Sequence, residues 1–285
     1  MKSFWLGLFA LVLAGSASAQ VVYDTIFINK GTMVAVDGNN YAYYAYNADP
    51  VFNQTNKRIL LDEGDSLYLT VINTDVIDHG IDITNTSGYS TLIPAGDTIT
   101  IPTKFDALGV YIFYADIDSP KFRYMGLGGM IAVDDFSGSS FYWNIKENQA
   151  KWNDSLEAGW TVDWNEYYPD YFTINGYSNP DINSDPSARV EGGVGETIRI
   201  YISNSGQSIH SLHFHGYHLE IVYSSKNSNH VGRSKDTFPI HSMESMILEL
   251  VPDKVGEYPV HDHNLVVASA GGIYPNGMFL TLLIE

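Results

Sequence analysis

The sequence predicts an all-β protein built from two copies of one antiparallel sandwich or barrel. Segments rich in Val, Ile, Thr and Tyr recur along the chain, with Gly, Asn and Asp between them. Typical expected strands are Leu67–Ile72, Thr98–Pro102 and Thr197–Ile202. One short helix is expected after Ser140. A chain of 285 residues is long enough for two domains with separate cores.

The two halves of the chain repeat one another. Leu61–Thr84 parallels Val190–His215, and Gly109–Asp116 parallels Gly256–His263, with matching Gly-acid turns. Repeats of this length argue for two copies of one β domain. The alignment places His79 on His210, Asp82 on His213, Thr84 on His215, Tyr114 on His261, Ala115 on Asp262 and Asp116 on His263.

The first nineteen residues have the pattern of an export signal. Lys2 supplies the positive start, Phe4–Ala14 is apolar, and Ala17–Ala19 is a small-residue cleavage site before Gln20. The apolar run is too short to span a bilayer. We therefore expect an exported protein, periplasmic or secreted, divided into residues 20–135, a connector at 136–171 and residues 172–285.

The predicted connector holds four tryptophans. Large aromatic side chains mostly serve burial, so they are expected to form an apolar strap across both domains, with a sugar-binding platform as the alternative. They are Trp143, Trp152, Trp160 and Trp164.

Charge and cysteine content restrict the possible partners. The chain has 15 basic and 33 acidic residues, and removal of Lys2 with the signal leaves 14, a net charge of −19. Such a field repels nucleic acid and anionic membranes and attracts cations. The chain has no Cys, which excludes disulfides and a thiolate-bound metal.

Six of the nine histidines lie in two short clusters of the second half. Within a strand, His213 and His215 face the same way, as do His261 and His263. If the two strands are neighbours, four imidazoles converge, which favours one or two copper ions, with zinc as the alternative. Ordinary surface histidines or a vestigial site are the competing interpretation. The remaining two of the six are His210 and His218, and His230 and His241 lie in loop-like sequence without partners.

These motifs resemble those of multicopper oxidases. "HSLHFHGYHLEIV" (210–222) is similar to the histidine motif of their last domain, and "GEYPVHDHNLVVASAGGIYPNGMFL" (256–280) to their closing His-Cys-His motif. The two-domain layout also resembles copper nitrite reductases. The resemblance implies two cupredoxin-like Greek-key β-sandwiches and, by analogy, a homotrimer. It also implies that the four histidines are ligands of an interdomain copper cluster, with His210 and Met278 matching the blue, type 1 site.

Departures from the family pattern narrow the expected function. Asp262 stands where the blue site needs Cys, and Ala115 stands at the matching place in the first half, so no type 1 copper is expected. The first half offers Asp82, Tyr114 and Asp116 where the oxidases supply histidines. By the resemblance, Asp82 takes the place of the catalytic acid of nitrite reductases and is the candidate for proton transfer.

Three functions follow as alternatives. The first is an exported copper-binding protein that sequesters copper or presents it to a partner. The second is a copper-dependent oxidoreductase without blue copper, acting on a small molecule or drawing electrons from an external donor. The third is a metal-free structural or interaction module. Tyr114, Asp116, His210 and Asp262 are expected around the site or at an interface.

Overall fold

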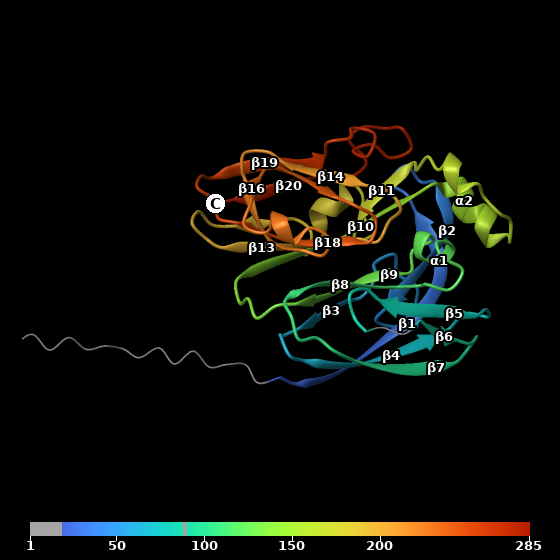
Figure 1. Ribbon diagram of the computed structural model, residues 1–285. Coiled ribbons are helices and arrows are strands. Elements are labelled where there is room, and N and C mark those ends of the chain that lie inside the picture. The colour runs from blue at the N-terminus through green and yellow to red at the C-terminus, as the bar shows by residue number, and fades with distance from the viewer. Residues whose placement is uncertain (1–18, 88–89) are drawn as a thin grey trace, which may run out of the picture.

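Two β-sandwiches make up the computed structural model, which describes residues 19–87 and 90–285 (Figure 1). The expected export signal, apart from Ala19, lies outside these residues. The first sandwich packs a four-stranded first sheet on a five-stranded second sheet. The first sheet runs β2 (Asn40–Asn47), β1 (Val21–Val34), β4 (Ser66–Asn73) and β7 (Thr98–Lys104). The second runs β3 (Arg58–Leu61), β9 (Gly128–Val133), β8 (Gly109–Tyr114), β5 (His79–Ile83) and β6 (Thr91–Ile93).

The second sandwich repeats this plan with a six-stranded third sheet and a five-stranded fourth sheet. The third runs β11 (Tyr171–Ile174), β10 (Ser139–Asn148), β13 (Ile198–Asn204), β18 (Glu244–Leu250), β15 (Leu219–Ser224) and β16 (Ser234–Lys235). The fourth runs β12 (Glu191–Gly192), β20 (Phe279–Ile284), β19 (Gly256–Asp262), β14 (His210–Phe214) and β17 (Thr237–Ile240). The prediction of an all-β chain of two sandwiches is confirmed.

Helices are short and lie outside the sheets. In the described part of the chain the α-helices are α1 (Lys121–Tyr124) and α2 (Ala150–Glu157), and 3₁₀ turns lie at Trp164–Glu166, Asp181–Ser184 and Ser228–His230. The α2 helix is fastened to β2, because the amide of Ala42 donates to Asp154 Oδ1 at 2.9 Å and its carbonyl accepts from Asn153 Nδ2 at 2.9 Å. No helix among the described residues is long and apolar enough to cross a membrane.

Strand pairing shows how far the two halves repeat each other. β1 pairs in parallel with β4, and β10 pairs in parallel with β13. Residues 139–148 were expected in a connector, but this pairing makes them the first strand of the second sandwich. Their backbone groups pair with β13, and their apolar side chains pack in the core of the second sandwich, where Trp143 is fully buried. We therefore propose a domain boundary just after β9 rather than at residue 172.

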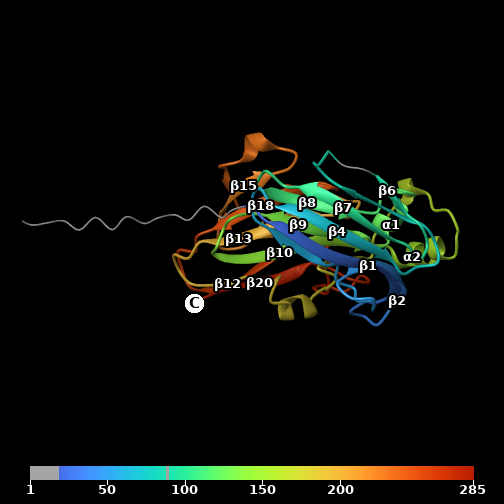
Figure 2. The same ribbon diagram turned by 90° about the horizontal axis from the view of Figure 1, so that it is seen from below.

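The sandwiches meet along the second and third sheets. β9 is buried along its whole length and β8 along nearly all of it, because one face covers the first core and the other faces the second sandwich (Figure 2). The apolar contact between the sandwiches comprises Val110, Met130, Ala132, Tyr201 and Ile247. The four sheets therefore stack as layers, and the fourth sheet has an outer face that is not covered by the first sandwich (Figure 1).

Candidate metal centre

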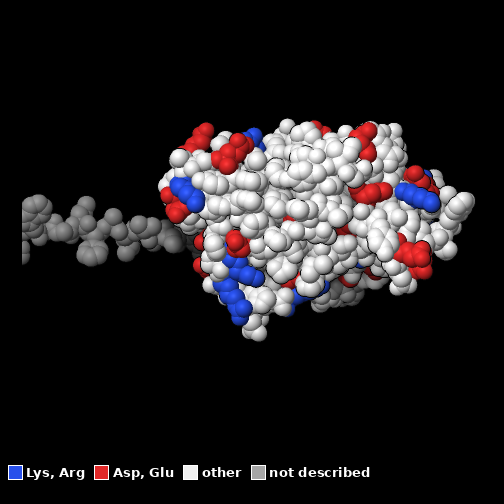
Figure 3. Space-filling view, turned by 90° about the horizontal axis from the view of Figure 1, so that it is seen from above, with Lys and Arg blue, Asp and Glu red and all other residues white. Residues whose placement is uncertain are grey.

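Four histidines meet on the outer face of the fourth sheet. In β14, Leu212 and Phe214 point into the core while His213 faces outward, the alternation expected of a half-buried strand. β14 pairs with β19 so that His213 stands opposite His261. Figure 3 views the molecule from this side, where charged side chains are sparse across the middle of the face.

The four imidazole rings are close neighbours. Ring centroids lie 4.7 Å apart for His213 and His215, 5.7 Å for His213 and His261, and 5.5 Å for His213 and His263. The Nε2 atoms of His215 and His261 are 3.0 Å apart. Two nitrogens bound to one ion at about 2.0–2.1 Å each are separated by roughly 3 Å. This pair therefore has the spacing of two ligands of one ion.

Hydrogen bonds on the other ring nitrogens orient two of these imidazoles. His213 Nδ1 donates to Thr237 Oγ1 at 2.9 Å, and His261 Nδ1 donates to the backbone oxygen of Asp262 at 2.8 Å. Each bond leaves Nε2 as the free nitrogen, as in metal-binding histidines. Burial and the neighbouring His213 and His261 lower the pKa of His215, which favours the neutral ring that a metal requires.

The donor set fits copper, although the side chains do not form a finished site as they stand. Among the described residues, no group of three or more His, Asp or Glu side chains is arranged to hold one ion. The His215–His261 pair has suitable spacing, and His213 and His263 adjoin it. Neutral imidazole nitrogens suit copper and zinc. His213, His215, His261 and His263 are therefore the residues that could hold a metal if one or more rings rotate.

A buried charged triad occupies the region behind the cluster. Asp262 points away from its neighbours His261 and His263, and its Oδ2 lies 3.0 Å from His210 Nδ1. The other ring nitrogen, Nε2, lies 3.1 Å from Glu147 Oε2. The three side chains are at most 1% exposed. Burial alone lowers the pKa of His210, but hydrogen bonds to Asp262 and Glu147, with their charges, raise it to about 9, so the ring is an imidazolium.

Glu147 belongs to this triad and was not found from the sequence. Its Oε1 accepts the backbone N–H groups of Gln207 and Ser208, both at 2.6 Å. Gly206 is required beside it, because a Cβ there would lie 1.9 Å from Glu147 Oε2. Glu147 lies in β10, within the range expected to be a connector, so no spacing pattern linked it to His210. Asp262 accepts backbone N–H groups too, from Ser211 at 3.0 Å and Asn264 at 2.8 Å.

The candidate residues of the first sandwich lie apart from the histidine cluster in the structure. Asp82 stands opposite Tyr114 in the strand register, at the place that His213 and His261 occupy in the second sandwich. Tyr114 donates to Asp82 at 3.1 Å, and its pKa is raised to about 12 by burial and by the charge of Asp82. Asp116 Oδ1 is buried without a hydrogen-bond partner among the described residues.

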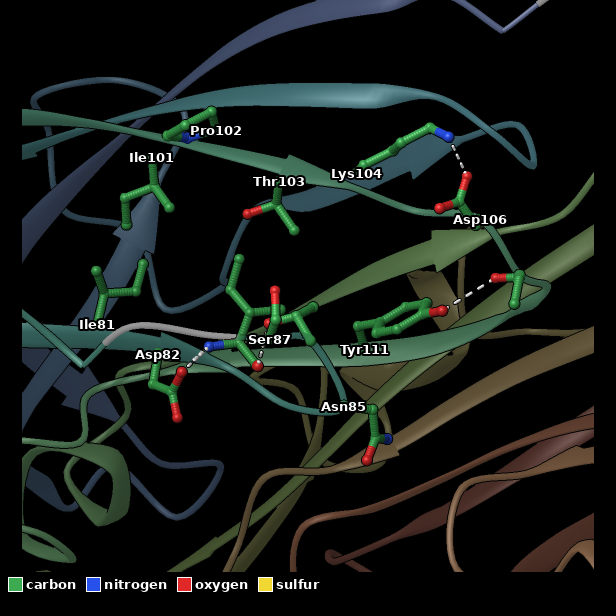
Figure 4. Close-up of a pocket in the computed structure, with 13 residues that line it drawn as sticks. Ile81, Asp82, Asn85, Ser87, Ile101, Pro102, Thr103, Lys104, Asp106 and Tyr111 are labelled. Carbon is green, nitrogen blue, oxygen red and sulfur yellow. Dashed lines mark hydrogen bonds and ion pairs between the residues drawn. The ribbon is translucent and has the colours of Figure 1, made fainter.

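Asp82 also borders a pocket of about 420 Å³ between β5, β7 and β8 (Figure 4). Its Oδ1 accepts the backbone N–H of Ile83 at 2.8 Å. The pocket belongs to the first sandwich, whereas β14 and β19, the strands of His213 and His261, lie on the far side of the second sandwich (Figure 1). Within one chain, Asp82, Tyr114 and Asp116 therefore do not reach the histidine cluster. His79 is a core residue, fully buried with Nε2 3.0 Å from Asp75 Oδ2.

Comparisons with known proteins agree with this geometry. A family model described as multicopper oxidase matches residues 159–275, a range that includes all four histidines. These residues resemble multicopper oxidases, and the fold of the whole chain is that of two cupredoxin-like β-sandwich domains. Similar solved structures include a blue copper oxidase from Nitrosomonas europaea (TM-score 0.79, 19% identity, 93% of this chain and 86% of that one). They also include a copper nitrite reductase from Nitrosomonas europaea (TM-score 0.73, 19% identity, 93% of this chain and 94% of that one).

At such identities the structural likeness shows a shared fold. A search of curated protein sequences finds no significant match. The chain differs from the blue copper pattern because it contains no Cys. Where the resemblance places the blue-copper cysteine, the chain has Asp262, bonded to the His210 imidazolium.

Proposed function

We propose that this is an exported copper-binding protein whose non-blue site is formed by His213, His215, His261 and His263. The observation that carries the proposal is the 3.0 Å separation of the His215 and His261 Nε2 atoms, with two further imidazoles beside them. Imidazole donors favour copper among divalent first-row metals. The net charge of −18 supports the proposal by concentrating cations around the molecule.

A redox activity at the same site is the second part of the proposal. Bound copper would supply one-electron chemistry, and the open outer face of the fourth sheet gives a small molecule access to it. The chain has no blue copper to deliver electrons, so they would come from the substrate or an external donor. This favours oxidation of a small molecule over reduction of nitrite or dioxygen. Asp82 would act in proton transfer only if a second copy of the chain placed it at the cluster.

The test is the spectrum and metal content of the copper-loaded mature chain. We expect weak, non-blue absorption and about one or two copper ions per chain, because no thiolate is available. An intense blue band would contradict the assignment of Asp262. Absence of copper retention would favour the metal-free module. Retention without turnover of phenols, nitrite, ferrous or cuprous ions would favour sequestration. Metal analysis of protein purified from its native compartment distinguishes copper from zinc.

Assembly into a homotrimer would bring the two separate sets of residues together. Beside the histidines, Leu265, Val266 and Tyr274 are each at least 60% exposed. In the first sandwich, Val76 before β5 is 88% exposed. Apolar surface of this kind marks a protein contact. A head-to-tail contact between the two regions closes a ring when the rotation is suitable.

Light scattering is expected to give three times the chain mass for the mature protein. Leu265→Glu should shift the protein to monomer, because it places a charge in the apolar contact. Glu220→Lys, a charge change at an exposed residue of β15 on another sheet, serves as the matched control and should leave the mass unchanged. A monomeric wild-type protein would exclude the trimer and, with it, any role of Asp82 at the metal.

A further inference from the structure

Arg58 presents a fixed cation at the boundary between the sandwiches. It begins β3, and its guanidinium lies over the ring of Tyr142 in β10, 4.2 Å from the ring centroid. Tyr142 stacks in turn on Tyr201, with centroids 4.9 Å apart and an interplanar angle of 18°. A guanidinium stacked on a ring in this way keeps its N–H groups at its edge, in a plane set by the ring.

The N–H groups of this guanidinium have no partner among residues 19–87 and 90–285. Within the described part of the chain, the Arg58 side chain forms no hydrogen bond or ion pair, and its contact is with the Tyr142 ring. By contrast, Arg199 pairs with Asp134 and Glu249, and Arg189 pairs with Glu257. Burial lowers the pKa of Arg58, a sign of incomplete solvation. In a chain with 33 acidic residues and 15 basic ones, a half-buried arginine left unpaired indicates that its partner comes from outside the chain.

A pocket of about 270 Å³ opens beside Arg58 and is lined by both sandwiches. Asp185 is the one carboxylate among the described lining residues. Its Oδ2 accepts from Asn175 Nδ2 and its Oδ1 from the Ser187 amide, both at 2.8 Å. These bonds leave lone pairs unused on both oxygens, and no hydrogen bond or ion pair joins this carboxylate to Arg58 within the described residues. The pocket is lined by two cations, Arg58 and Lys57, and by the one anion Asp185. Lys57 is paired with Asp24, so Arg58 is the lining cation without an ion-pair partner among the described residues.

We propose that this pocket binds a small zwitterion of the free amino acid class. The ligand carboxylate would pair with the edge of the Arg58 guanidinium, and its ammonium group would face Asp185. The volume of about 270 Å³ suits a ligand of this size. A guanidinium fork matches a carboxylate in a two-bond arrangement, and the opposed charges match a zwitterion better than a simple anion or cation. The site is separate from the histidine cluster and does not depend on copper.

Binding can be measured on the metal-free mature chain by titration calorimetry with three probes that share a short carbon skeleton. These are L-alanine, propionate, which lacks the ammonium, and ethylamine, which lacks the carboxylate. L-alanine is expected to bind at least about tenfold more tightly than either other probe, a factor that corresponds to about 1.4 kcal/mol. Equal affinity for propionate and L-alanine, or no binding of L-alanine at about 10 mM, would overturn the proposal.

Variants test the two charged groups separately. Arg58→Lys is expected to lower L-alanine affinity at least about tenfold, because a compact ammonium cannot present the planar fork. Arg233→Lys is the matched control, at an exposed arginine outside the pocket, and should leave affinity unchanged. Asp185→Asn should make L-alanine and propionate bind equally. Retained affinity in Arg58→Lys together with Arg58→Gln would refute the site, and unchanged unfolding midpoints would show that both variants fold.

Discussion

His210→Ala is expected to lower the free energy of unfolding by about 3–5 kcal/mol. The change removes the imidazolium that lies 3.0 Å from Asp262 and 3.1 Å from Glu147, with all three side chains at most 1% exposed. Two carboxylates would then face the same buried space without a cation between them. Denaturant unfolding of the mature chain, followed by circular dichroism, measures the loss.

The control is Lys104→Ala, which removes a pair with Asp106 whose side chains are 59% and 67% exposed. It should cost less than about 1 kcal/mol. The pH dependence gives a second readout. A pKa raised from 6.5 to about 9 means that the His210 contribution is complete below pH 6.5 and is lost as the pH rises through 9. The stability difference between wild type and His210→Ala should therefore narrow between about pH 7 and 10. A constant difference would show that the ring is neutral.

The double variant His213→Ala with His263→Ala is expected to weaken copper binding at least about 100-fold, because it removes two of four imidazole donors. Both side chains project from the outer face of the fourth sheet, so the change leaves the core intact. Copper affinity is measured by competition with a chromophoric chelator. Unfolding of the metal-free variant gives a readout independent of the metal, and its midpoint should stay close to that of wild type.

His230→Ala with His241→Ala is the matched control. It removes the same number of imidazoles from loop positions away from the cluster and should leave copper affinity within about twofold of wild type. Equal losses in the two double variants would mean that copper binds the chain nonspecifically. An unchanged affinity in the His213 and His263 variant would refute the site assignment.

Much of the candidate site could be read from the sequence because it follows strand periodicity. His213 and His215, like His261 and His263, are two residues apart, so the period of a strand puts each pair on one face. The internal repeat extends to the strand register, since Asp82 stands opposite Tyr114 as His213 stands opposite His261. The sequence placed residues 139–148 in the connector and did not predict that they form a sheet strand. β10 contains Trp143, and its sequence was grouped with the Trp-rich segment that follows it. Its pairing with β13 assigns it to a sheet.

The sequence by itself determined the all-β class, the two-fold repeat, the histidine pairs and the exclusion of a thiolate-bound copper, because these depend on local periodicity and composition. The tertiary structure decided which distant residues meet. Glu147 reaches His210 across 63 positions of the chain, and Arg58 lies on Tyr142 across the boundary between the sandwiches. Such contacts depend on how the sheets stack and on which buried charges are brought together. The periodicity of side chains along one strand does not predict them.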